Sequence, residues 1–408
     1  MPFNSKNIIN EKSILWFIIL VGTILRVYNA FEIPFTHDEL SAIMRLQYNS
    51  FTELINYGVK VDGHPALIQV FLYYWTHLFG LDEITVKIPF ILLGIASIPL
   101  SYTITKKWFN GTSALLVASF IATLQFPVMF SQIARPYISG MFFILVLSYY
   151  WTEFLFNTKH SKWSIAGLII FASLSTYNHY FSFMLAGIIG VTGFFFVTKR
   201  NAIQYLLAFL TVGVIFIPHL NIFFYQLNIQ GLDWLSTPTI SFFTEHLKFI
   251  FHFNTLVYLL ILGLFVFGLL QSKKIQFNKF QIVSLIWFLA PIIIGVTYSI
   301  YIKPVVQYST LIFSFPFLII FILSWIKPLK PVVQVALVSL ILLINTSTLI
   351  VGRSYYDVFY HQPFEEFSNL TNKFINGSFT DSVPTNFEII YGDNPKYLNF
   401  YFKDQNPI

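Results

Sequence analysis

The sequence predicts an all-α polytopic membrane protein, and three observations carry this prediction. Hydrophobic residues make up 56% of the 408 residues and charged residues only 10%, whereas soluble domains are about 45–50% apolar and about 25% charged. Apolar runs long enough to span a bilayer, about 17–25 residues, recur along the chain. The Lys and Arg pairs between these runs fit one consistent membrane topology.

The apolar runs number about eleven, and each can form a transmembrane helix. They lie near residues 14–30, 86–105, 112–131, 137–156, 163–178, 180–198, 201–223, 246–270, 280–300, 305–326 and 331–351. Residues 65–80 form a shorter run, which reaches only ~24 Å at ~1.5 Å per residue and carries Gln69, Thr76 and His77. We expect this run to be an interfacial or re-entrant helix. No small-residue cleavage site follows the first run, so we expect a retained anchor.

Basic residues predict the orientation, because Lys and Arg concentrate in cytoplasmic loops. With the N-terminus inside and residues 65–80 left out of the count, every basic pair falls on the cytoplasmic side. These pairs are Lys106–Lys107, Lys159 with Lys162, Lys199–Arg200, Lys273–Lys274 with Lys279, and Lys327 with Lys330. The prediction is therefore a transmembrane domain of residues 1–351, with an external first loop at 31–85 and a short external C-terminal region at 352–408.

Residues 38–58 of the first loop carry apolar side chains at roughly helical spacing, which predicts one or two amphipathic helices in the interface. Thr36 can cap the first of them, with Asp38 and Glu39 in its first turn, where carboxylates suit the helix dipole. The acidic pair is then either an ordinary helix start or part of a site, and the residues alone leave both interpretations open.

Polar residues that interrupt the apolar runs, or lie at their ends, gather on the predicted outer face. Such convergence in a membrane protein indicates a functional site. Arg135 could instead be an anchor that reaches for lipid headgroups, Tyr177 and His179 could belong to an aromatic belt, and Arg26 suits a structural role in the first span. The gathered residues are Asp38, Glu39, His64, Arg135, Tyr137, Asn178, His179, Lys303 and Gln307.

Five motifs in order carry a family resemblance: "HDE" (37–39), "GHPALIQVFLYYWTHLFG" (63–80), "SQIARPYI" (131–138), "YNHYFSF" (177–183) and "VVQYSTLIFSFPFLII" (305–320). Over residues 14–326 the chain resembles the GT-C class of polytopic membrane glycosyltransferases. The similarity is to the protein mannosyltransferase and aminoarabinose transferase superfamily (glycosyltransferase family 39-like), in the branch of rhizobial lipopolysaccharide galacturonosyltransferases. It implies a bundle of about 11–12 transmembrane helices with amphipathic helices in the first outer loop.

The resemblance also implies a reaction, in which a hexosyl or pentosyl group passes from a polyprenyl-phosphate carrier to an acceptor hydroxyl. The family's acidic residue in the first loop acts as the base, which matches Asp38, with Glu39 orienting it or contacting the acceptor. Arg135 suits the leaving lipid phosphate because its planar fork matches phosphate geometry. His64 and Lys303 are further candidates for the phosphate, and Tyr137, His179 and Gln307 for substrate contacts.

The chain departs from the family pattern at several positions. It has "HPALI" where the family often has "HPPLY", Ile133 where an acid often precedes "ARPY", and Gln307–Tyr308 where Arg–Tyr is common. Lys303 is the cation that could substitute at the last of these. The C-terminal region is short and contains the strand-like segments "NFEIIYG" and "YLNFYF". The acceptor (glycan, lipid or protein) is therefore left open.

Other functions are disfavoured. Scattered Lys and Arg argue against nucleic acid despite a net charge of +6, and no nucleotide-binding motif appears. No cofactor is certain, and a divalent cation, Mg²⁺ or Mn²⁺, held by Asp38, Glu39 and His37 or His64 is left open. A lipid or sugar transporter or flippase is the main alternative, and a membrane scaffold is the third. We expect a multi-pass protein of a bacterial inner (plasma) membrane, with the site on the extracytoplasmic face.

Overall fold

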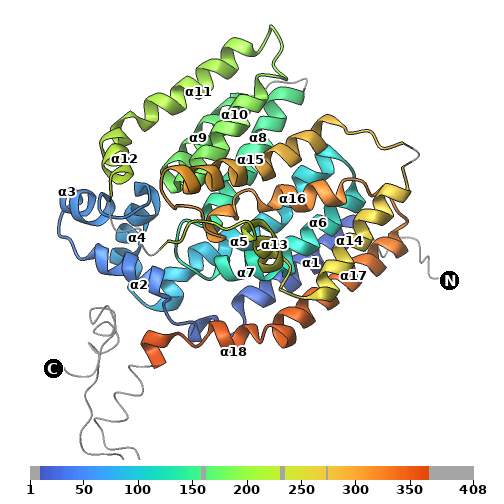
Figure 1. Cartoon of the computed structure of the whole chain (residues 1–408), viewed down its shortest axis with the longest axis horizontal. Helices are drawn as coiled ribbons and strands as arrows, with labels where there is room; N and C mark the ends of the chain where they lie inside the picture. Colours follow the sequence, from blue (N-terminus) through green and yellow to red (C-terminus); the bar gives the residue numbers. More distant parts are fainter. Residues whose placement is uncertain (1–9, 158–161, 230–234, 273, 367–408) are drawn as a thin grey trace, which may run out of the picture.

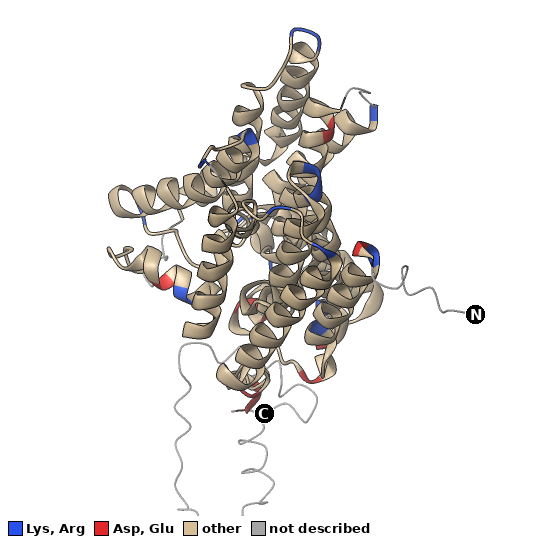
Figure 2. Cartoon of the chain, turned by 90° about the vertical axis from the view of Figure 1, so that its right-hand side faces the viewer, with Lys and Arg blue, Asp and Glu red and all other residues tan. Residues whose placement is uncertain are grey.

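The computed structural model describes residues 10–157, 162–229, 235–272 and 274–366, and within these ranges the chain is helical without any β-strand (Figure 1). Six helical segments are long and apolar enough to cross a membrane, or up to eight if each of two bent pairs is one span. This confirms a polytopic all-α membrane protein. Charged residues are sparse, and most of the ribbon belongs to uncharged residues (Figure 2).

Each predicted span contains a helix or a bent pair of helices. The six long segments are α1 (Glu11–Val27, with a further turn to Glu32), α5 (Glu83–Trp108), α8 (Ile138–Phe156), α11 (Ala202–Phe216) continuing into α12 (Leu220–Leu227), α15 (Lys279–Tyr301) and α17 (Pro331–Ser347). Helix α9 (Lys162–Asn178) matches the predicted run, whereas two others are shorter than the sequence predicted: α10 (Tyr180–Gly193) and α16 (Phe315–Leu323). Long uninterrupted helices are therefore fewer than the eleven apolar runs.

The two bent pairs have local causes. Helices α6 (Gly111–Thr123) and α7 (Gln125–Ser131) meet at 55°. Pro127 explains this break, because its ring clashes with the carbonyl group four residues earlier in a continuous helix. Helices α13 (Phe242–Ile250) and α14 (Thr255–Leu270) meet at 93°, where His252 and Phe253 adopt positive φ angles of 62° and 50°.

His252 also secures the second break. Its Nε2 accepts a hydrogen bond from the backbone N–H of Gln125 at 2.7 Å, and its Nδ1 lies 2.9 Å from the hydroxyl of Thr348. The buried ring therefore joins both bent pairs to the end of α17, which keeps the broken helices in register.

The first loop folds as the sequence predicts, into short helices. They are α2 (His37–Ile43), a 3-10 turn (Met44–Leu46), α3 (Phe51–Glu53), a π turn (Leu54–Val59) and α4 (Ala66–Phe79). Gln69, one of the polar residues that interrupt the apolar pattern of α4, donates to the backbone carbonyls of Ala42 at 2.9 Å and Arg45 at 3.2 Å. The side chain of Gln69 thus holds α4 against the end of α2 through hydrogen bonds.

The helix ends that the charge pattern assigns to one side do meet at one end of the bundle. Lys106 pairs with Glu11 at 2.5 Å, and Lys107 with Glu153 at 2.6 Å. Lys279 lies over the ring of Phe156 at 3.7 Å. We call the opposite end, which carries residues 31–85, the loop end.

Arg26 has the structural role that the sequence favoured. It is fully buried in α1 and donates to the carbonyls of Gly22, Ile121 and Ala122 and to the hydroxyl of Ser131, at 2.8–3.1 Å. These bonds hold α1 against the break between α6 and α7. Helix α18 (Tyr355–Phe359) packs at the loop end. Residues 367–408, which include the two strand-like segments, lie outside the described residues.

Candidate active site

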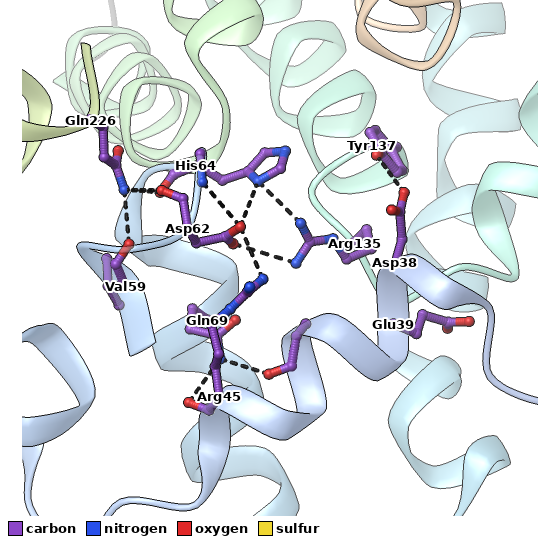
Figure 3. A network of polar contacts seen from close by, with 12 residues as sticks. Asp38, Glu39, Arg45, Val59, Asp62, His64, Gln69, Arg135, Tyr137 and Gln226 are labelled. Atoms are coloured by element: carbon purple, nitrogen blue, oxygen red, sulfur yellow. Dashed lines mark hydrogen bonds and ion pairs between the residues drawn. The ribbon is translucent and has the colours of Figure 1, made fainter. Parts of the chain in front are cut away.

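Asp38 and Glu39 lie in the first turn of α2, as predicted, and leave the helix in different directions (Figure 3). Thr36 begins the helix with a capping box: its hydroxyl accepts from Glu39 N at 3.4 Å, and the Glu39 carboxylate accepts from Thr36 N at 2.9 Å. Because successive helical residues are about 100° apart, Glu39 turns into the bundle and Asp38 stays exposed.

Glu39 is enclosed by protein groups. It is 1% exposed. Its two oxygens lie 2.7 and 2.8 Å from the ammonium nitrogen of Lys87, on α5, and it accepts from the backbone N–H of Ala134 at 2.7 Å. Since Ala134 directly precedes Arg135, Glu39 fastens the start of α2 both to α5 and to the loop that carries Arg135. Asp38 is left as the carboxylate of the pair that faces outward.

Asp38 accepts a hydrogen bond from the hydroxyl of Tyr137 at 3.0 Å. Burial, together with the negative charge of Asp38, raises the pKa of Tyr137, so the phenol remains a donor, and Ser309 lies within hydrogen-bonding reach of it. The hydroxyl of Ser309 in turn donates to Oε1 of Gln307 at 3.4 Å. Tyr137 therefore lies at the centre of a short polar chain from Asp38 to Gln307.

A second cluster forms around Asp62 (Figure 3). Its Oδ1 accepts from Arg45 Nη2 at 3.0 Å, and its Oδ2 accepts from Arg135 Nη1 at 3.4 Å. His64 Nδ1 lies 3.3 Å from Asp62 Oδ1 and 3.1 Å from Arg135 Nη2. Two guanidinium groups and an imidazole thus converge on one carboxylate, which we call the Asp62 cluster.

The charges in the Asp62 cluster are mutually stabilised. Burial would raise the pKa of Asp62, but the positive charge of Arg135, with a contribution from Arg45, holds it well below its usual value. Burial likewise opposes the charge on Arg135, yet Asp62 and Asp38 raise its pKa. Both groups are therefore ionised. A guanidinium can only donate, so the His64 tautomer with its proton on Nε2 satisfies the shorter of the two Nδ1 contacts.

A glutamine from α12 holds the turn that carries Asp62 and His64. Gln226 Nε2 lies 2.8 Å from the carbonyl oxygen of Val59, 2.5 Å from that of Asp62 and 2.9 Å from that of His64. The hydroxyl of Tyr180 donates to the same glutamine side chain. Three carbonyls gathered on one amide fix the turn against α12 and α10.

The Arg135 loop has its own supports. Asn178 donates to the carbonyl of Pro136 at 2.8 Å, and His179 places its ring 4.9 Å from that of His64 and 6.4 Å from that of Tyr137. Burial, followed by the positive charge of Arg135, lowers the pKa of His179, so this ring is neutral. Arg135 is 5% exposed and pairs with Asp62, a setting that differs from that of an anchor reaching for headgroups.

The structure brings together most of the residues chosen from the sequence. Asp38 meets Tyr137, and His64 meets Arg135 and lies beside His179. Lys303 donates to the backbone carbonyl of Ile229, beyond α12, and Gln307 contacts its own turn through Ser309 and Thr310. In the described part of the chain, no group of three His, Asp or Glu side chains could hold a metal ion. Glu39 faces Lys87 rather than His64, so Glu39 and His64, two of the metal ligands that the sequence left open, do not lie together.

Asp62, the carboxylate at the centre of the Asp62 cluster, was not identified from the sequence. Asp62 directly precedes the motif "GHPALIQVFLYYWTHLFG" (63–80) but was not selected as a candidate, and neither was Arg45. Nothing in a lone turn Asp indicates two guanidinium partners, because Arg45 and Arg135 come from segments 17 and 73 residues away. Lys87, at the start of an apolar run, carried a signal that could have been used. A buried lysine requires a carboxylate partner.

A polytopic bundle whose first loop folds into short helices over one end is the architecture of the GT-C membrane glycosyltransferases, and comparison with solved structures confirms this fold. The chain is similar to ArnT, an aminoarabinose transferase from Cupriavidus metallidurans. For apo ArnT the TM-score is 0.58 at 14% identity, over 88% of this chain and 70% of that chain. For ArnT bound to undecaprenyl phosphate it is 0.54 at 13% identity, over 90% and 72%. No protein-family model and no curated protein matches the chain.

Proposed function

We propose that the chain is a glycosyltransferase that moves a sugar from a polyprenyl-phosphate carrier to an acceptor hydroxyl. The observation that carries this proposal is the arrangement at the loop end of a GT-C bundle. There an exposed carboxylate, Asp38, and a buried guanidinium, Arg135, lie close enough for their charges to interact. A structure with the same fold holds undecaprenyl phosphate, which supports a lipid-linked donor.

The residues divide the reaction between them. Asp38 takes the proton of the acceptor hydroxyl as its oxygen attacks the anomeric carbon. The bond between that carbon and the phosphate oxygen breaks, and its electron pair stays on the phosphate. Arg135 stabilises the charge that develops there. Tyr137 fixes one oxygen of Asp38, so the other oxygen remains available for the proton.

The remaining residues position this pair or contact substrate. Glu39 orients Asp38 through the capping box and ties it to the Arg135 loop. His64 and His179 lie beside Arg135, where a sugar or a phosphate can meet them, and Gln307 lies at the end of the Tyr137 chain. Lys303 lies beyond α12 and is the more distant candidate for the phosphate. The acceptor is a glycan, lipid or protein hydroxyl, and the sugar is a hexose or pentose.

The experiment is a transfer assay with the purified protein in lipid nanodiscs. Synthetic polyprenyl-phosphate hexoses and pentoses are supplied with and without a panel of glycan, lipid and peptide acceptors. We expect release of polyprenyl phosphate that depends on an acceptor. The two bent helix pairs are a feature that transporters share. Movement of the intact donor lipid across a liposome bilayer, without transfer, would therefore favour the flippase alternative.

We further propose that the protein lies in a bacterial inner membrane with the loop end outside. The Lys and Arg pairs at the opposite end support this orientation. Single Cys substitutions at Asn49, in the first loop, and at Gln276, before α15, test it. Both positions are exposed. In intact cells an impermeant thiol reagent should label Asn49→Cys and spare Gln276→Cys, and the reverse pattern would invert the topology.

A further inference from the structure

The Asp62 cluster contains one carboxylate more than a simple phosphate site needs. The two arginines bind its two oxygens separately, with Arg45 on Oδ1 at 3.0 Å and Arg135 on Oδ2 at 3.4 Å. The two non-bridging oxygens of a phosphate ester are spaced much like carboxylate oxygens, and guanidinium groups bind both kinds of anion. An arrangement that brackets a carboxylate in this way can also bracket a phosphate.

From this geometry we propose that Asp62 is the resident counter-ion of a two-arginine phosphate site, in which Arg45 is the second cation beside Arg135. The inference rests on the proposed function and names a binding residue, Arg45, and a positioning residue, Asp62, that the reaction scheme above does not use. Its ligand is the phosphate of the lipid carrier.

The charges of the reaction require a second cation. A polyprenyl-phosphate sugar is a phosphodiester with one negative charge, whereas the released polyprenyl phosphate is a monoester that carries up to two. With Asp62 ionised, the two arginines and the carboxylate give the cluster one net positive charge, which matches the donor. The net charge of the cluster does not change when the guanidinium groups turn, so the second negative charge of the product is stabilised only if both guanidinium groups contact the phosphate directly.

The contacts show where that adjustment can occur. The 3.4 Å contact between Arg135 and Asp62 is at the weak end of the hydrogen-bonding range. Arg135 Nε is buried and makes no hydrogen bond within the described residues, so this guanidinium keeps a donor that Asp62 does not use. A buried donor without a partner is costly, and a phosphate oxygen is a group that can satisfy it. Arg135 can therefore turn toward a phosphate at little cost.

Asp62 also has a role when no phosphate is present. The guanidinium groups of Arg135, which is buried, and Arg45, which is half-buried, lie close together and repel each other, and one carboxylate between them offsets that repulsion. Gly63 N donates to Asp62 Oδ1 at 3.1 Å, and Gln226 holds the carbonyl of the same residue. The carboxylate is thus fixed in place by its own turn, so it competes with the phosphate without leaving the site and limits how tightly the product binds.

The test measures binding of a fluorescent polyprenyl monophosphate to the full-length protein in nanodiscs. Asp62→Asn should tighten binding by about tenfold, since a nearby negative charge is removed. Arg45→Gln should weaken binding by about tenfold, and Arg45→Lys should recover part of the loss. Lys60→Gln is the matched control, because Lys60 is a cation of the same loop that lies over the ring of Tyr225, 4.5 Å from its centre. The control should bind like the wild type.

The outcomes separate this inference from the proposed function. Unchanged or weaker binding in Asp62→Asn would reduce Asp62 to a support of its turn, and unchanged binding in Arg45→Gln would remove the second cation. If Asp62→Asn does not fold, the two Arg45 variants decide the matter. Inorganic phosphate and uncharged polyprenol are the reference ligands. If the wild type binds polyprenol as tightly as polyprenyl phosphate, the glycosyltransferase proposal itself fails.

Discussion

Asp38 and Glu39 are neighbours in the chain, yet they occupy opposite environments. Glu39 is buried and receives hydrogen bonds from Thr36, Lys87 and Ala134, whereas Asp38 is exposed and receives one from Tyr137. The oxygens of Glu39 are occupied by fixed donors, whereas Asp38 has an oxygen that an acceptor hydroxyl can reach. Two adjacent residues in the first turn of one helix can therefore have different roles: Glu39 stabilises the fold, and Asp38 is available for catalysis.

The largest effect that this comparison predicts is on the chemical step. Asp38→Asn keeps the size of the side chain and removes the base, so turnover should fall by about 10²–10⁴-fold. The amount of folded protein should hardly change, because the side chain is exposed. Glu53→Gln is the matched control, since it removes an exposed acid of the same loop. Normal transfer by Asp38→Asn protein would make the acidic pair no more than a helix start.

The next effect belongs to the buried acid and is on stability. Lys87→Met leaves Glu39 buried without its cation, which should cost about 3–5 kcal/mol of folding free energy. Thermal unfolding in detergent should show a lower midpoint, and the double variant with Glu39→Gln should recover part of it. An unchanged midpoint in Lys87→Met would mean that the pair does not hold α2 to α5.

Arg135 connects the two environments, because its loop is tied to Glu39 while its guanidinium faces the site. Arg135→Ala should cost about 2–4 kcal/mol of transition-state stabilisation, by analogy with the loss of an oxyanion donor. Arg135→Lys should recover only part of this loss, because an ammonium group cannot form the bidentate contact. The measurement is kcat/KM for the lipid donor, and full activity in Arg135→Ala would exclude a role at the phosphate.

The smallest effect is expected at Tyr137. Tyr137→Phe removes one hydrogen bond to Asp38, which is worth about 0.5–1.5 kcal/mol. Turnover should fall by less than in Asp38→Asn, with folding unaffected. Tyr48→Phe is the control, since that hydroxyl donates to the carbonyl of Tyr57 at 3.2 Å in the same loop. A loss as large as that of Asp38→Asn would indicate that the phenol itself takes part in proton transfer.

The sequence predicted those parts of the fold that depend on local pattern. Apolar runs predicted where helices form, and Thr36 with Glu39 predicted the start of α2. The breaks were harder to predict. Pro127 was a visible signal for the first, whereas the 93° turn at His252 depends on contacts with Gln125 and Thr348 that the local sequence does not contain.

The candidate site was predictable as a set of residues but not as a network. The charge pattern placed Asp38, His64, Arg135 and His179 at one end of the bundle, and the structure brings them there. Which partner each charged group contacts depends on the direction of its side chain. Adjacent residues at a helix start point in different directions, and hydrophobic periodicity does not predict these directions. The central position of Asp62 depends on such partners, so it could be found only in three dimensions.

Helix α18 and the residue after it, which are synthesised late, contact the loop that carries Arg135. Tyr355 donates to the side chain of Gln132 at 2.5 Å, although the two residues are 223 positions apart in the chain. Gln132 also donates to the hydroxyl of Tyr360 at 3.1 Å, and its carbonyl accepts from Lys87 at 3.1 Å. The loop that carries Arg135 is therefore synthesised early, but its hydrogen bonds form only after residues 355–360 have been synthesised. A nascent chain that has inserted its first helices still lacks these two hydroxyl partners, so the site reaches its final form only when α18 has left the ribosome.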